Sequence, residues 1–195
     1  MSNPELTPKE PDLYSSTLLE ARSIFIFGEI SQKMALEVCR QLLVMQQKSD
    51  DPMTIYINSQ GGHVEAGDTI HDMIRFVKPK VYIIGTGWVA SAGVNIFLAV
   101  DSARRLSLPN TRYMIHQPSG GVHGATVDIN IEAKEILKIR QRINTLISQQ
   151  TGKPFEQVQK DTERNFWMSA QGAIDYGIVG KIISSQDELD KIIGV

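Results

Sequence analysis

The chain has 195 residues, of which 42% are hydrophobic and 22% are charged, and its formal net charge is −2 at pH 7. This composition is typical of one globular domain; it gives no reason to expect nucleic acid as a partner, and no apolar run approaches the ~20 residues of a membrane span. Cys39 is the only cysteine, which excludes an internal disulfide and fits a reducing compartment such as the cytoplasm.

The first half of the sequence alternates between apolar runs and helix-like patterns. Residues 1–13 are polar and contain prolines, which predicts a mobile arm, whereas residues 14–195 are expected to form one domain. The alternation predicts α/β layering with parallel strands. The expected elements are a helix over 14–22, a strand over 24–28, a helix capped by Ser31, a strand over 53–58, a helix between Gly62 and Pro79, and a strand over 81–84.

The second half contains the longest predicted helix, over 128–150, which Gly152 and Pro154 end. Its apolar residues recur at helical spacing and form one stripe, made of Ile129, Ala133, Ile136, Ile143 and Ile147. The other elements expected here are strands over 105–108 and 112–115, a Gly-rich piece over 119–124, a helix over 155–164, a helix capped by Ser169, and a strand over 178–183.

Ser91 is the first candidate functional residue. It stands in a Gly-rich stretch, 85–93, which is predicted to be the turn between the strand over 81–84 and a helix over 94–99. The free N–H groups and the positive dipole end of a helix N-terminus stabilise negative charge that develops beside such a serine. The same pattern also fits a buried serine in a tight turn, so a partner residue must decide between the two interpretations.

A nucleophilic serine needs a base, and histidine is the usual one at neutral pH. His116 follows a strand, at the same kind of sheet edge as Ser91, and is therefore the predicted base, with a structural histidine as the alternative. His63 and His71 lie on the helix after Gly62, and His123 lies in the Gly-rich piece. No metal-ligand spacing and no ATP-binding loop occurs, so no cofactor is expected.

Four motifs carry a resemblance to a known family over about residues 14–183. They are Asn58-Ser59-Gln60-Gly61-Gly62, Ala90-Ser91-Ala92-Gly93, Met114-Ile115-His116-Gln117-Pro118 and Asp161-Thr162-Glu163-Arg164. In order and spacing the chain resembles the Clp protease proteolytic subunit, ClpP. The resemblance implies a crotonase-like α/β fold, a spiral of strand-strand-helix units with a protruding handle helix, which the helix from Asp128 fits.

The resemblance also implies an assembly and partners. ClpP-like subunits are expected to form a homo-oligomer of two stacked seven-membered rings, which encloses a chamber. Unfolded polypeptide would be delivered by an AAA+ unfoldase such as ClpX, ClpC or ClpA, and that partner rather than this chain would use ATP.

The resemblance assigns residue roles as well. Ser91 matches the nucleophile, His116 the general base, and the N–H groups of Gly62 and Ala92 the oxyanion hole. The substrate-binding strand matches Gly120, Gly121, Val122, His123, Gly124 and Ala125. The unfoldase-docking positions match Tyr56, Phe76 and Leu106, and the ring-ring contact matches Glu163 and Arg164.

Asn165 is the main departure from the family, which has aspartate at this position of the triad. Asparagine can accept a hydrogen bond from histidine through its carbonyl oxygen, but it brings no charge to stabilise the imidazolium. Two smaller departures are Gln60, where proline is usual, and Ala92, where methionine is usual. Both alter the groove near the nucleophile, while Ala92 keeps its N–H group.

The sequence therefore predicts a serine endopeptidase with a Ser91-His116-Asn165 triad and low activity on its own. One alternative is a structural or regulatory subunit that works in a mixed barrel beside a ClpP paralogue with the Asp triad. Another is a crotonase-fold acyl-CoA enzyme, which shares the scaffold but does not explain Ser91 together with His116.

Overall fold

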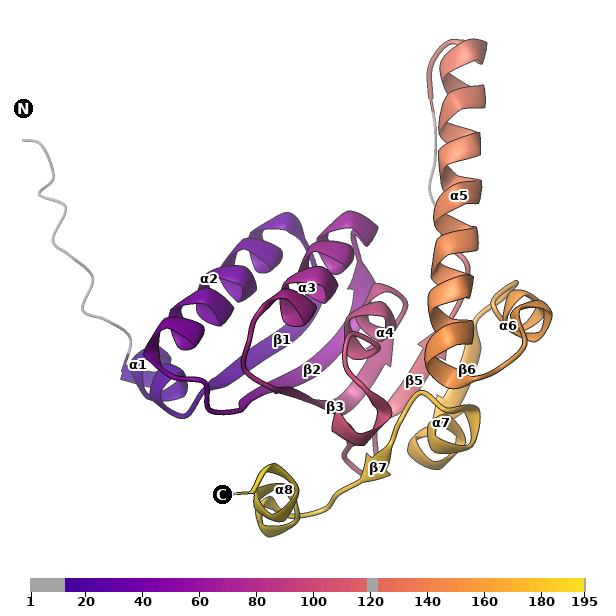
Figure 1. Ribbon diagram of the computed structural model, residues 1–195. Coiled ribbons are helices and arrows are strands. Elements are labelled where there is room, and N and C mark those ends of the chain that lie inside the picture. Colours follow the sequence, from indigo (N-terminus) through magenta and orange to yellow (C-terminus); the bar gives the residue numbers. More distant parts are fainter. Residues whose placement is uncertain (1–12, 119–122, 195) are drawn as a thin grey trace, which may run out of the picture.

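The computed structural model describes residues 13–118 and 123–194, with helices packed on a mostly parallel sheet (Figure 1). The predicted N-terminal arm lies outside the described residues except for residue 13. The strands are β1 (Ser23–Ile30), β2 (Met53–Gly62), β3 (Val81–Ala90), β4 (Arg105–Ser107), β5 (Arg112–Ile115), β6 (Phe166–Ser169) and β7 (Lys181–Ile182). The helices are α1 (Leu13–Glu20), α2 (Gln32–Lys48), α3 (Val64–Phe76), α4 (Ala92–Phe97), η1 (Ser102–Arg104), α5 (Thr126–Thr151), α6 (Phe155–Asp161), α7 (Ala170–Tyr176) and α8 (Gln186–Ile193).

The sheet divides at β3, and this division positions the site. Within the described residues the main path runs β1-β2-β3-β4-β7 with parallel pairing, as the alternation of strands and helices predicted. The first half of β3 pairs with β4, whereas residues 88–90 at its end pair with β5. β5 in turn pairs antiparallel with β6. The end of β3 therefore lies next to the end of β5, and the end of β5 lies next to the start of β6.

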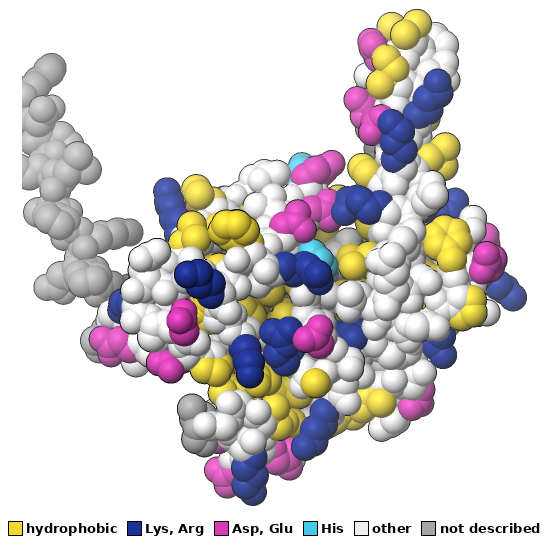
Figure 2. All heavy atoms as spheres, viewed as in Figure 1, with side chains coloured by type: hydrophobic (Ala, Val, Ile, Leu, Met, Phe, Trp, Pro, Cys, Tyr) yellow, Lys and Arg dark blue, Asp and Glu magenta, His cyan; other side chains and the backbone are white. Residues whose placement is uncertain are grey.

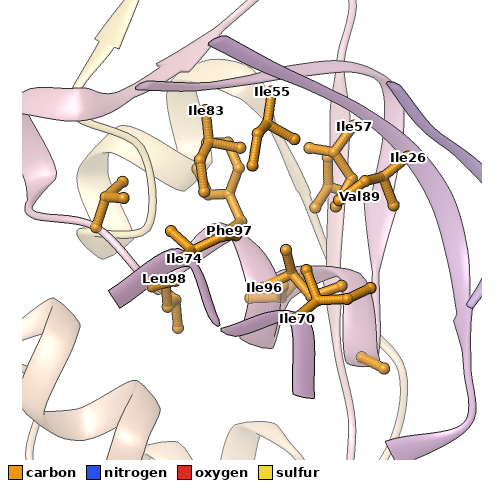
Figure 3. Close-up of a cluster of buried hydrophobic side chains, with 14 of the residues drawn as sticks. Ile26, Ile55, Ile57, Ile70, Ile74, Ile83, Val89, Ile96, Phe97 and Leu98 are labelled. Atoms are coloured by element: carbon orange, nitrogen blue, oxygen red, sulfur yellow. The ribbon is translucent and has the colours of Figure 1, made fainter. Parts of the chain in front are cut away.

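The core lies between the sheet and the helices that cover one of its faces. Figure 3 shows isoleucines of β1, β2 and β3 facing Ile70 and Ile74 of α3 and the apolar residues of α4. Helix α2 buries four apolar residues at helical spacing: Ala35, Val38, Leu42 and Met45. Ser31 caps this helix as expected, because its side chain accepts a hydrogen bond from the Met34 N–H at 3.3 Å.

Helix α5 extends far beyond the rest of the chain (Figure 1), as a handle helix would. Its predicted apolar stripe is buried only near the C-terminal end, at Ile143 and Ile147. Figure 2 shows hydrophobic side chains on the protruding part. Large exposed hydrophobic residues there are Val127, Ile129, Ile131 and Leu137. Within the described residues, no helix is long and apolar enough to cross a membrane.

The stretch 85–93 is not a turn, as its glycines suggested, because β3 continues through Ala90 and the chain turns only at Ser91. The glycines are needed for close packing within the strand. A Cβ atom on Gly85 would lie 2.2 Å from the Tyr113 hydroxyl, and one on Gly87 would lie 2.8 Å from the Asn58 side chain. Glycine therefore occurs here where other side chains pack closely against the backbone of β3. The strand ends directly before Ser91, which places this residue at the sheet edge.

The C-terminal elements also differ from the prediction. The strand expected over 178–183 is reduced to Lys181–Ile182, because Ile178 and Val179 follow the left-handed Gly177 and pack into the core as a loop. The sequence analysis did not predict α8. Its N-terminal signal is present, however, since Ser185 caps the helix by accepting a hydrogen bond from the N–H of Glu188 at 3.3 Å.

Candidate active site

Ser91 occupies a strained position between β3 and α4. It is one of two non-glycine residues with positive φ in the described part of the chain, at φ 55° and ψ −124°. Such backbone conformations are uncommon for residues with a side chain and cluster at functional sites. Two neighbours hold the turn: the Ser91 N–H donates to the Met114 carbonyl at 2.9 Å, and Gly61 leaves only enough room for the serine. The surrounding strands therefore fix the direction of the hydroxyl.

The structure brings together three of the predicted site residues. The hydroxyl of Ser91 lies 2.8 Å from Nε2 of His116, and Nδ1 of His116 lies 3.0 Å from Oδ1 of Asn165. Strand pairing explains both contacts. Ser91 follows the β3 segment that pairs with β5, and His116 follows β5; Asn165 precedes Phe166, which pairs with Ile115.

The contact with Asn165 fits one tautomer of His116. With the proton on Nδ1, His116 donates a hydrogen bond to the carbonyl oxygen of Asn165. Nε2 then has a free lone pair that accepts the hydrogen bond from the Ser91 hydroxyl. This is the tautomer that a general base needs. Asn165 itself is exposed, so solvent reaches this end of the hydrogen-bonded chain.

A polar network that the sequence analysis did not predict connects the segments next to His116 and Asn165. The Gln117 N–H donates to the carbonyl of Thr162 at 2.6 Å, and the Gln117 side chain donates to the carbonyl of Glu163 at 3.0 Å. The buried Thr162 hydroxyl donates to Oδ1 of Asn144 in α5 at 3.0 Å. Gln117 and Thr162 lie within the motifs at residues 114–118 and 161–164, and this was the sequence signal for the network. The network ties the segment before Asn165 to the segment after His116.

The two predicted oxyanion-hole residues lie near Ser91. Ala92 follows it at the start of α4, where helix N–H groups lack partners within the helix. Gly62 ends β2 directly after Gly61, which packs against Ser91. A Cβ atom at Gly62 would lie 2.3 Å from the carbonyl oxygen of Ile30, so only glycine fits there.

The other described histidines do not contact Ser91. Nδ1 of His63 lies 3.1 Å from the Glu65 carboxylate on the protein surface. The buried His71 has its Nδ1 2.7 Å from the backbone carbonyl of Asn95. His123 is exposed and precedes α5. In residues 13–118 and 123–194 no cluster of side chains suited to a metal occurs.

The remaining predicted positions are only partly described. Within the predicted substrate-binding strand, Gly120, Gly121 and Val122 lie outside the described residues, while His123, Gly124 and Ala125 are exposed. Glu163 and Arg164 of the predicted ring-ring contact are also exposed.

The predicted docking residues differ in their exposure. Phe76 is 74% exposed, and Tyr56 is partly buried and stacks on Phe25. Leu106 is 1% exposed and packs in a small core cluster with Ile84. Its side chain therefore cannot meet a partner directly, because the chain itself covers it. A role for Tyr56 and Phe76 stays a prediction.

A serine, a histidine and a third hydrogen-bond acceptor arranged in this way define the class of serine hydrolases. The family model described as Clp protease matches residues 8–186. The ATP-dependent Clp protease proteolytic subunit 3 of Rhizobium etli is 52% identical over 174 residues, which cover 89% of this chain and 90% of that protein. The ATP-dependent Clp protease proteolytic subunit 2 of Gluconobacter oxydans is 53% identical over 174 residues, which cover 88% of this chain and 78% of that protein.

Two solved structures are also similar: ClpP1 from Listeria monocytogenes, with a TM-score of 0.82, and a ClpP1 N165D mutant from the same organism, with a TM-score of 0.85. In each case the identity is 56%, with 91% of this chain and 99% of the other covered. The chain therefore belongs to the Clp protease family, as a ClpP-type proteolytic subunit with the crotonase-like ClpP fold.

Proposed function

We propose that this chain is a serine endopeptidase subunit of a barrel-shaped Clp protease, which cleaves unfolded polypeptides delivered by an AAA+ unfoldase such as ClpX, ClpC or ClpA. The observation that carries this proposal is the continuous hydrogen-bonded chain from Ser91 through His116 to Asn165. The proposed location is the cytoplasm, where the unfoldase would supply the ATP-driven step.

In the proposed mechanism, the Ser91 oxygen attacks the carbonyl carbon of the scissile peptide while its proton passes to Nε2 of His116. The N–H groups of Gly62 and Ala92 stabilise the oxyanion that forms. Nε2 then gives the proton to the departing amine, which leaves an acyl ester on Ser91. Water attacks this ester with His116 again as base, and the serine is restored.

Asn165 limits this mechanism electrostatically. Its carbonyl oxygen holds the His116 tautomer, as an aspartate would, but it offers no negative charge to the imidazolium formed during attack. In a serine protease with another fold, replacing the triad aspartate by asparagine lowers turnover by ~10⁴-fold, chiefly through the wrong tautomer. That cost is an upper limit here, because a carbonyl oxygen beside Nδ1 of His116 favours the correct tautomer.

The exposed apolar side chains of α5 support assembly into two stacked heptameric rings. Val127, Ile131 and Leu137 are each more than half exposed, at 68%, 53% and 60%. Apolar surface of this kind on a protruding helix marks a contact with another protein surface. In the proposed barrel, the handle helices of the two rings interdigitate and cover one another.

A second candidate function is a weakly active regulatory subunit in a mixed barrel with an Asp-triad ClpP paralogue. The observation that favours it is the exposed, neutral Asn165, which directly follows the exposed Glu163 and Arg164. A neighbouring ring that contacts these charged residues would also set the position of Asn165, so assembly and activity would be coupled.

Peptide hydrolysis separates the two candidates. The rate is measured for the purified homo-oligomer and for a barrel mixed with a paralogue whose own nucleophile has been removed. The endopeptidase proposal predicts cleavage in both settings that Ser91→Ala abolishes and Ser102→Ala, at an exposed position in η1, does not. Cleavage that depends on Ser91 only in the mixed barrel supports a subunit that its partner activates. No Ser91-dependent cleavage in either setting refutes the endopeptidase.

A further inference from the structure

Asn95 carries a side-chain amide that the proposed mechanism does not use. The residue lies in α4, four positions after Ser91, and is only 3% exposed. Its backbone carbonyl interacts with Nδ1 of His71 at 2.7 Å, which fixes this part of α4. Among the hydrogen bonds of the described residues none involves its side-chain amide. The amide atoms are not among the fully enclosed, unpaired polar atoms of the described residues, so they are open to a hydrogen-bonding group that enters from outside the chain.

The amide borders a cavity that begins at the catalytic pair. The cavity volume is about 20 Å³, and Ser91 and His116 contribute to its lining. Apart from them, Asn95 is the one polar residue that the described part of the chain places in this lining. The walls are otherwise apolar and include Ile115 at the end of β5 and Ile147 in α5.

The position of the cavity indicates which part of a substrate enters it. During attack the Ser91 oxygen bonds to the carbonyl carbon of the residue that precedes the scissile bond, and the side chain of that residue starts one carbon away. A cavity lined by Ser91 itself therefore receives this side chain. The volume of about 20 Å³ corresponds to roughly one water-sized group, which favours a short side chain over a long or aromatic one.

We propose that Asn95 is a specificity-determining residue that selects serine, a short side chain with a hydroxyl, immediately before the cleaved bond. The carboxamide oxygen accepts a hydrogen bond from the substrate hydroxyl, and the carboxamide N–H group can donate to it. An aliphatic side chain of equal size would leave the amide buried and unpaired. Sites built to hydrogen-bond a substrate reject analogues that lack the polar group. This inference rests on the proposed peptidase activity of Ser91.

Two activated esters test the proposal. They are 4-nitrophenyl esters of one peptide that ends either in serine or in 2-aminobutyrate, which has a methyl group in place of the hydroxyl. Activated esters acylate a serine without protonation of a leaving amine, so even a slow homo-oligomer gives a measurable rate. For the full-length assembled protein we expect kcat/KM to be at least about 10-fold higher for the serine ester.

Two variants assign the preference to Asn95. Asn95→Leu keeps the side-chain size but removes the amide, and the ratio of the two kcat/KM values should fall to about 1 or below. The matched control is Ile147→Val, which enlarges the same cavity without changing its polar group; this variant should keep the preference for serine. Labelling of Ser91 by a fluorophosphonate reports whether each protein has a competent nucleophile.

The outcomes are distinguishable. Equal rates with the two esters in the wild-type protein would show that the amide holds only a resident water and would overturn the proposal, even if Asn95→Leu does not fold. A serine preference that persists in Asn95→Leu would assign selectivity to another residue. If wild-type Ser91 is neither labelled nor acylated, the peptidase proposal itself fails; labelling without discrimination between the esters refutes only the role of Asn95.

Discussion

Replacing Asn165 by aspartate tests whether the missing charge limits catalysis. Nδ1 of His116 and Oδ1 of Asn165 are 3.0 Å apart, so a carboxylate at this position would directly face the imidazolium formed during attack. Two opposite unit charges 4 Å apart attract by about 1 kcal/mol in water and by about 4 kcal/mol at an effective dielectric constant of 20. Because Asn165 is exposed, we expect about 1.4–2.8 kcal/mol, which corresponds to about 10- to 100-fold in rate.

The assay is hydrolysis of a fluorogenic peptide by wild type and Asn165→Asp at equal concentrations of assembled subunits. Each protein is measured alone and mixed with a paralogue that lacks its own nucleophile. The matched control is Asn110→Asp, which adds the same charge at an exposed position in the turn before β5 and should leave the rate unchanged. Fluorophosphonate labelling normalises each rate to the number of competent Ser91 nucleophiles.

The result decides between two physical explanations of a low rate. A higher rate of peptide hydrolysis for Asn165→Asp in the homo-oligomer shows that the missing charge limits catalysis. If Asn165→Asp gains little while co-assembly activates Ser91, the alignment of the triad is limiting, and the ring-ring contact near Glu163 and Arg164 provides it. An Asn165→Asp protein that is no faster in either setting refutes the electrostatic reasoning.

Three further predictions follow from packing, charge and exposed apolar surface. Gly61→Ala should lower peptidase activity at least about 10-fold, because its Cβ would lie 2.6 Å from the Cβ of Ser91 at a φ of +98°; an unchanged rate in a folded protein would contradict the tight packing at the turn. The hydrogen bond from Arg104 lowers the pKa of Asp101 in the folded protein below its ordinary value of 3.8. The pair therefore stabilises the folded state above pH 3.8, and this stabilisation is lost as the pH falls through the lowered pKa. Urea unfolding of Asp101→Asn at pH 7 should therefore show a loss of less than about 1 kcal/mol, which shrinks toward pH 3; a constant difference would contradict the pairing. Leu137→Asp should shift the assembled particle toward single rings in analytical ultracentrifugation, because a charge replaces an apolar side chain that is 60% exposed on the handle; an unchanged particle mass would place the ring contact elsewhere.

The triad geometry could be predicted from sequence because short motifs encode it. Ser91 and His116 each follow a strand, and parallel strands bring such ends to one edge of a sheet. The motif that ends at Arg164 then located Asn165, and the antiparallel pairing of β5 with β6 accounts for its contact with His116. Local patterns were sufficient there because each residue lies directly at a strand end.

Other features depend on contacts between distant segments, which local patterns do not report. Gly85 and Gly87 looked like turn residues, although they belong to β3 and make room for Tyr113 and Asn58. The burial of Leu106 depends on cover by the C-terminal segment, which only the fold reveals. The unpaired amide of Asn95 is likewise visible only once its neighbours are known.

The most direct test of the whole account is active-site labelling of the assembled wild-type protein with a fluorophosphonate, followed by peptide mass spectrometry. The hydrogen bond between Ser91 and His116 predicts a single adduct on Ser91. His116→Ala should slow labelling strongly, and Ser91→Ala should abolish it. An adduct on a different serine, or labelling that is equally fast in His116→Ala, would contradict the proposed nucleophile and its base.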